Sequence, residues 1–223
     1  MITNNSKLSI SQIIEGHDKL LVSFGGIRQG LGVPVFEFFK SLENLDCDKI
    51  FIRDFNQAWY HKGIDKDLSS INETVLYLKE KCKGYKKVCF LGNSMGGYAS
   101  ILFGVLVEVD TILAFSPQTF IDRFNRLKYL DRRWKKQIQS IYSSNAKQPT
   151  FFDLKKVLKT KRNIKTKIFI HHSSKHRLDN AHAQRIRNLN NVKVFPHSQG
   201  GHAVVRWIKE KGELISIIEE AIN

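Results

Sequence analysis

A serine between two glycines is the clearest chemical signal in this sequence. Ser94 lies in the run Gly92-Asn93-Ser94-Met95-Gly96, after an apolar strand-like stretch and before an apolar helix-like stretch. A tight strand-to-helix turn holds such a serine clear of the backbone and tolerates little bulk two residues to either side of it. The turn also leaves backbone N–H groups unpaired at the start of the helix, where they can stabilise a developing negative charge. The pattern therefore predicts Ser94 as a nucleophile.

His202 is the candidate base for this serine. It follows the strand-like run VKVFP and lies in the segment Ser-Gln-Gly-Gly-His, before the last helical stretch. Chemistry in parallel α/β folds gathers beyond the carboxyl ends of the strands, so a base is expected after a strand. His197 ranks second, and the pair His171-His172 is interpreted as structure or pocket lining.

The acid is expected between the serine and the histidine in the chain. The segment HHSSKHRLDNAHAQ follows the strand-like run TKIFI, and its carboxylate is Asp179. An ionised carboxylate there would fix the tautomer of the histidine and stabilise its charged form. Two alternatives stay open. Asp179 could instead be the N-cap of a helix that starts at LDNA, and Asp122 could be the acid.

Two segments are expected to supply the oxyanion hole. The N–H of Met95 follows the nucleophile directly, and the second donor should come from the loop after the first main strand, at Gly26 or Ile27. The glycines of that loop allow close backbone approach to a substrate. Six residues near these segments or on a basic stretch are predicted to bind substrate: Gly25, Asn93, Trp59, Tyr60, Arg132 and Arg133.

Strand-like and helix-like runs alternate along most of the chain, which indicates an α/β fold with a mainly parallel sheet covered by helices on both faces. The strand-like runs are 20–24, 49–53, 87–91, 111–115, 167–171 and 192–195. The helix-like runs are 35–42, 71–83, 97–106, 181–189 and 203–221. Residues 5–15 are expected to add an antiparallel strand or hairpin at the edge of the sheet.

Most of the net charge of +15 comes from one segment. Between Asp122 and Lys167 there are fifteen Lys or Arg and three Asp, which gives this segment +12 and the rest of the chain +3. It is also the longest interval between consecutive predicted strands, and it is rich in aromatic residues. We interpret residues 118–165 as a small helical cap insertion with a basic surface, which would favour anionic substrates. A solvated face that only keeps the protein soluble is the alternative.

Length and composition favour one domain, residues 1–223, with a sizeable core. The N-terminal residues lack the pattern of a signal peptide, no apolar run reaches membrane-spanning length, and a cytoplasmic location is expected. Three cysteines without metal-ligand spacing indicate reduced thiols and no metal site, and no cofactor is predicted. The basic patch lacks a nucleic-acid-binding module, so nucleic acid is not an expected partner. The oligomeric state is not predicted.

The segments FGG, GNSMGG and GGH, in this order, resemble those of the α/β-hydrolase superfamily over nearly the full length of the chain. The chain is most similar to compact bacterial hydrolases, some of which are linked to surface-polysaccharide genes, through IRDFNQAWYHKGI, AFSPQ and the closing GGH. Many of these relatives carry an aspartate about where His176 stands, so the acid stays open between the candidates above.

These residues and the resemblance together predict a serine esterase or deacylase. Its substrate would be an ester, and the basic segment favours an acylated acidic glycan. Two alternatives remain. The enzyme could be an acyltransferase that uses a sugar hydroxyl in place of water, or the chain could be a non-catalytic glycan-binding or secretion-accessory module that keeps the fold.

Overall fold

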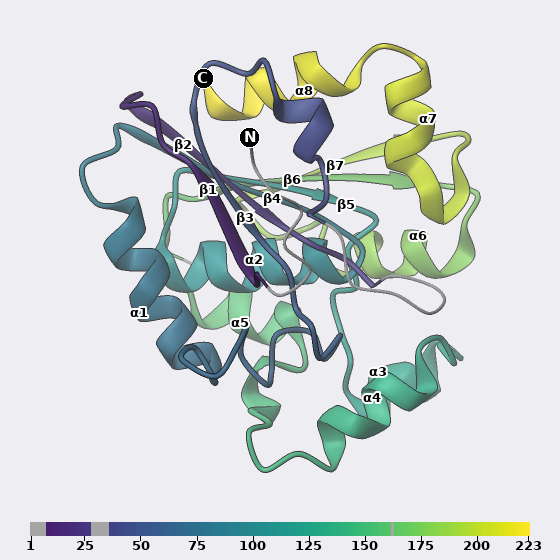
Figure 1. Cartoon of the computed structure of the whole chain (residues 1–223). Helices are drawn as coiled ribbons and strands as arrows, with labels where there is room; N and C mark the ends of the chain where they lie inside the picture. The colour runs from purple at the N-terminus through teal and green to yellow at the C-terminus, as the bar shows by residue number, and fades with distance from the viewer. Residues whose placement is uncertain (1–7, 28–35, 162) are drawn as a thin grey trace.

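A mainly parallel sheet lies at the centre of the molecule (Figure 1). The computed structural model describes residues 8–27, 36–161 and 163–223. Their strands form one sheet in the order β1-β3-β2-β4-β5-β6-β7, in which β1 is antiparallel to β3 and the other pairs are parallel. The strands are β1 (Ile10–Ile13), β2 (Lys19–Phe24), β3 (Asp48–Ile52), β4 (Lys87–Asn93), β5 (Thr111–Phe115), β6 (Lys167–Ser173) and β7 (Val192–His197). The predicted α/β class and the antiparallel edge strand are confirmed.

Helices cover both faces of the sheet, because the central strands are apolar on both sides. In β4, Phe90 packs into the cluster that contains α1 (Ile71–Cys82), α2 (Met95–Val107) and α5 (Leu154–Thr160). Its neighbours Cys89 and Leu91 pack into a second cluster with α7 (Val204–Glu210) and α8 (Leu214–Ile222). Figure 1 shows these two groups of helices on opposite sides of the sheet.

Three predicted helices differ from the structure. The run 203–221 is divided into the 3₁₀ turn η3 (Gly201–Ala203), α7 and α8, and Gly212 between the helices has a φ of 76°, which a continuous helix does not allow. The run 181–189 is replaced by α6 (Arg177–Gln184), which begins earlier because the His176 side chain accepts a hydrogen bond from the N–H of Asp179. Within 35–42, residues Phe39–Leu42 form a 3₁₀ turn, η1, and residue 35 lies outside the described residues.

The basic segment lies between β5 and β6 and contains α3 (Arg123–Lys128), α4 (Lys135–Tyr142), the 3₁₀ turn η2 (Pro149–Phe151) and α5. The predicted insertion, residues 118–165, spans these elements. Figure 1 shows α3 and α4 projecting away from the sheet, whereas α5 lies beside α2. No helix of the described residues is long and apolar enough to cross a bilayer.

Candidate active site

Ser94 lies at the sharp turn between β4 and α2. Its backbone is strained, with φ 54° and ψ −115°, and such conformations persist only where the surroundings hold them. The surroundings here leave no space for side chains on the flanking glycines. A Cβ on Gly92 would lie 2.1 Å from the Gly96 carbonyl oxygen, and a Cβ on Gly96 would lie 2.1 Å from the Phe24 carbonyl oxygen. The two glycines are therefore required by packing, and they let the turn present the hydroxyl at the carboxyl end of the sheet.

His202 reaches Ser94 from the other end of the chain. It lies in η3 just after β7, where Gly200 and Gly201 turn the backbone with positive φ angles of 89° and 54°. Its Nε2 is 3.0 Å from the Ser94 Oγ, and its Nδ1 is 2.8 Å from the Oδ2 of Asp179. An ionised Asp179 accepts a hydrogen bond from the Nδ1–H, which leaves Nε2 free to accept the serine proton.

Asp179 is fully buried in the first turn of α6. Burial opposes ionisation, but the hydrogen bond from His202 and the charges of His202, Arg133 and His176 outweigh it, so the pKa of Asp179 lies below its ordinary value. The expected alternative, Asp179 as N-cap, is wrong because His176 occupies that position. The Nδ1 of His176 also lies 3.1 Å from the same Oδ2 that faces His202.

The structure places the other acid and base candidates away from these contacts. Asp122 is the N-cap of α3, where its side chain accepts hydrogen bonds from the backbone N–H and the side-chain amide of Asn125. The Nε2 of His197 lies 3.0 Å from the Nδ1 of His171, and the two rings stack. His171 of β6 and His197 of β7 therefore form a pair of their own, whereas His202 has Ser94 and Asp179 as its partners.

The predicted oxyanion donors are at the carboxyl ends of β2 and β4. Met95 is the first residue of α2, so its N–H has no acceptor within the helix. The N–H of Gly26 donates to the carboxyl of Glu37, which also accepts a hydrogen bond from the Asn93 side chain. Burial nevertheless raises the pKa of Glu37 to about 7. Because Gly26 already has an acceptor, the N–H of Ile27 is the better candidate for the second donor.

Three of the predicted substrate-binding residues have buried polar side-chain atoms: Trp59, Tyr60 and Asn93. The Tyr60 hydroxyl is buried and donates to the carbonyl oxygen of Gly25 at 3.0 Å, and the indole N–H of buried Trp59 donates to the Gln118 side chain at 3.0 Å. Asn93 is the last residue of β4, and its buried Oδ1 has no hydrogen-bond partner among the described residues. Tyr60 thus supports the loop after β2, Trp59 contacts the segment after β5, and Asn93 has an unpartnered acceptor next to Ser94 in the chain.

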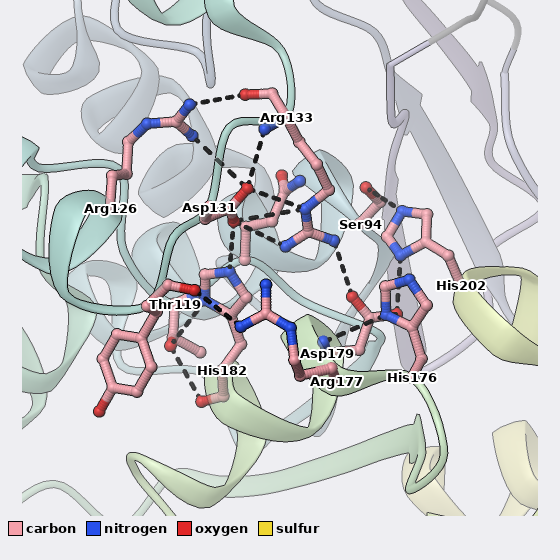
Figure 2. Close-up of polar contacts among 12 residues, drawn as sticks. Ser94, Thr119, Arg126, Asp131, Arg133, His176, Arg177, Asp179, His182 and His202 are labelled. Carbon is pink, nitrogen blue, oxygen red and sulfur yellow. Dashed lines mark hydrogen bonds and ion pairs between the residues drawn. The ribbon is translucent and has the colours of Figure 1, made fainter.

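The two predicted arginines of the basic segment have different surroundings. Arg132 is exposed and lines a surface groove with Leu127 and Leu130. Arg133 points inward, with 18% of its side chain exposed, and donates hydrogen bonds to Asp179 and to Asp131 (Figure 2). The charge of Arg133 is therefore matched by two carboxylates of the protein itself.

The sequence did not predict two buried carboxyls, Glu37 and Asp131, that bond to residues around Ser94, His202 and Asp179. Glu37 lies within the apolar run VFEFF. A single carboxyl among apolar residues is the one signal that could have indicated a role for it near the site. Asp131 precedes two arginines and resembled an ordinary surface charge, but it is 4% exposed. Both positions depend on how distant segments pack, which the local pattern does not encode.

One group of side chains near the serine has the composition of a metal site. His176, Asp179 and His202 each offer a ligand atom, and these atoms lie within 4.8 Å of one another. The carboxylate already accepts hydrogen bonds from His202 and from the Arg133 guanidinium at 2.9 Å. This cation opposes binding of a second positive charge, so the group suits proton transfer better than metal binding.

Solved structures with the α/β-hydrolase fold match nearly the whole chain. A capsule O-acetyltransferase of Neisseria meningitidis serogroup A is 16% identical, with a TM-score of 0.72 over 92% of this chain and 89% of that one. MenH from S. aureus is 14% identical, with a TM-score of 0.59 over 96% and 98% of the two chains. An esterase from Pyrococcus furiosus is 15% identical, with a TM-score of 0.56 over 95% and 85%.

No protein-family model and no curated protein sequence matches the chain. The structural matches, together with the parallel sheet and the strained Ser94 turn, show that this chain has the α/β-hydrolase fold.

Proposed function

We propose that this protein is a serine esterase or deacylase that works through an acyl-enzyme on Ser94. The observation that carries this proposal is the continuous chain of hydrogen bonds from Ser94 through His202 to Asp179, at 3.0 Å and 2.8 Å. The fold, which this chain shares with esterases and an acetyltransferase, supports an enzyme. An intact nucleophile, base and acid are the residues that acyl transfer requires.

The proposed reaction has two halves. His202 Nε2 takes the proton of Ser94 as its Oγ attacks the ester carbonyl carbon, and the resulting oxyanion accepts hydrogen bonds from the N–H groups of Met95 and Ile27. The bond to the leaving alcohol then breaks, and His202 gives that alcohol the proton. In the second half, water loses a proton to His202 and attacks the acyl carbon; the bond to the Ser94 Oγ then breaks, His202 returns the proton to that oxygen, and the acid is released.

The charge of the insertion supports an anionic substrate. Residues Asp122 to Lys167 contribute +12 of the net +15, and several of their cations are exposed, including Arg132, Lys135 and Lys136. A positive field near a site concentrates anions and raises their association rate, and salt weakens the effect. We therefore propose an ester on an acidic glycan, or another anionic ester, as the substrate.

Acyl transfer to a sugar hydroxyl is the second candidate. It is favoured by the likeness to the capsule O-acetyltransferase, whose TM-score of 0.72 exceeds the 0.56 of the Pyrococcus esterase. The first half of the reaction is the same in both candidates, and they differ in whether water or a sugar hydroxyl attacks the acyl carbon. The fate of the acyl group therefore separates them.

Covalent labelling tests the shared step. A fluorophosphonate probe should attach to Ser94, as mapped by peptide mass spectrometry, and should not attach to Ser94→Ala. Loss of the label in His202→Ala would show that reactivity depends on the base. A folded wild-type protein that takes no label would instead favour a non-catalytic binding module.

Partitioning of the acyl group tests the second step. An activated short-chain acyl donor is supplied with and without acidic oligosaccharide, and free acid and acylated sugar are quantified by mass spectrometry. Release of free acid at the same rate in both samples indicates an esterase. Acylated sugar formed at the expense of free acid indicates a transferase.

A further inference from the structure

Arg133 connects the insertion to the proposed catalytic acid. It lies between α3 and α4, and its Nη1 donates to the Asp179 Oδ1 at 2.9 Å. The opposite oxygen of the same carboxylate faces His202. Its Nη2 donates to the Asp131 Oδ2 at 2.8 Å, and its Nε to the Asp131 Oδ1 at 3.1 Å (Figure 2). The guanidinium is therefore fixed between two buried carboxylates.

Asp131, the second carboxylate that binds Arg133, is itself held in place. The Asp131 Oδ2 lies 3.1 Å from Nε2 of His182, whose Nδ1 accepts the Thr119 N–H at 3.0 Å. That backbone contact places the proton of neutral His182 on Nε2, from which it donates to Asp131. His182 and Asp179 both belong to α6, so the Arg133–Asp131 pair meets one helix at two points.

We infer that Arg133 is a positioning residue, through which the insertion orients Asp179 and keeps it ionised for His202. This inference rests on the proposed function. Each oxygen of Asp179 has its own donor, Arg133 on one side and His202 on the other, so the plane of the carboxylate is determined from both sides. In this inference Arg133 acts through Asp179 and is not a catalytic residue.

The charge of Arg133 should also affect the pH dependence of activity. A cation next to Asp179 opposes the gain of a proton by the Asp179–His202 pair, so its removal should make the pair protonate at higher pH. Other titratable groups surround the pair, and removal of Arg133 also changes the charge that acts on all of them except His172. They are His172, His176, His182 and Asp131.

The test compares Arg133→Met and Arg133→Lys with the wild type on a neutral aryl ester. We expect Arg133→Met to lower kcat by about 10-fold to 100-fold, since a misplaced catalytic group loses rate on this scale, while KM changes little. The acid limb of its kcat/KM profile should move up by about 0.5 pH unit or more. Arg133→Lys keeps the charge and should restore most of the pH profile. Lys147→Met, an exposed charge loss in the same segment, serves as the matched control.

Proton NMR provides a second measurement that needs no turnover. The far-downfield signal of the His202 Nδ1–H, assigned by its absence in His202→Ala, should shift or broaden in Arg133→Met and recover in Arg133→Lys. If Arg133→Met only lowers Tm and leaves kcat, the pH profile and this signal unchanged, Arg133 merely attaches the insertion and the inference fails. If Ser94 takes no fluorophosphonate in the wild type, the proposed function fails, whereas the NMR signal still tests the positioning.

Discussion

Replacing Asp179 by Asn exchanges one carboxylate oxygen for an amide nitrogen, and Arg133 determines which one. The native oxygens face the Arg133 Nη1 at 2.9 Å and the His202 Nδ1 at 2.8 Å. An amide that turns its NH₂ toward the guanidinium sets two donors against each other and loses a hydrogen bond to a charged group, which is worth about 1.5–3 kcal/mol. The amide oxygen should therefore stay on Arg133, and the NH₂ should face His202.

This orientation gives His202 the wrong tautomer. Its Nδ1 must accept a hydrogen bond from the amide NH₂, so the ring proton lies on Nε2, which then cannot take the proton of Ser94. We expect Asp179→Asn to lower kcat by about 10⁴-fold with the fold intact. Removal of Arg133 should free the amide to turn its oxygen to His202. The 1.5–3 kcal/mol above corresponds to about 10-fold to 150-fold, which sets the upper range of recovery.

The assay is steady-state hydrolysis of a neutral aryl ester by the wild type, Asp179→Asn, Arg133→Met and the double variant. The double variant should be faster than Asp179→Asn, although Arg133→Met alone is slower than the wild type. A double variant as slow as the product of the two single effects would refute this account of the amide orientation. Near-normal turnover in Asp179→Asn, together with a loss in Asp122→Asn, would show that the acid is misassigned.

Three further predictions concern the serine, the charge of the insertion and acid stability. Ser94→Ala and His202→Ala should each abolish nearly all esterase activity, and the double variant should add little because the residues act as a unit; kcat under identical conditions tests this. Four charge reversals to Glu should lower kcat/KM for an anionic ester, in a salt-dependent way, and leave a neutral ester nearly unchanged; an equal loss on both would assign the charge to solubility. The positions to reverse are Arg132, Lys135, Lys136 and Lys156. Burial opposes ionisation of Asp131, but its hydrogen bonds to His182 and Arg133 outweigh burial and lower its pKa. The ionised carboxylate therefore stabilises the fold above its unfolded pKa of about 3.8. This contribution is lost as the pH falls through the pKa of Asp131 in the folded protein. Asp131→Asn should flatten the fall of unfolding free energy below about pH 4 in denaturant titrations, and an unchanged slope would contradict the assignment.

The parts of the site that sequence could predict are those set by local backbone chemistry. Gly92 and Gly96 indicated a turn without space for side chains, and the structure shows the close backbone contacts that require them. The apolar runs predicted the parallel strands, because both faces of a covered sheet must be apolar. Functional side chains follow the carboxyl ends of such strands, so chain position predicted Ser94 and His202 and left the acid between Asp179 and Asp122.

The parts that sequence could not predict depend on packing between distant segments. Arg132 and Arg133 are adjacent and chemically identical, but one is exposed and the other is held between Asp131 and Asp179. The basic composition of the segment suggested a substrate role for both. Only the path of the chain between α3 and α4 distinguishes them. The break at Gly212 was missed for a related reason, since one glycine in an apolar periodic run is tolerated in many helices.

The order of the elements along the chain affects how the nucleophile becomes reactive during synthesis. Ser94 precedes His202 by 108 residues, and His202 leads directly into α7 and α8. These two helices pack on the face of the sheet opposite to α2, and that docking holds the loop of His202 in place. A growing chain on the ribosome therefore carries an inert hydroxyl at Ser94. In the proposed mechanism the side chain gains its base only when the last helices have folded, so acylation of Ser94 cannot begin before α7 and α8 have docked.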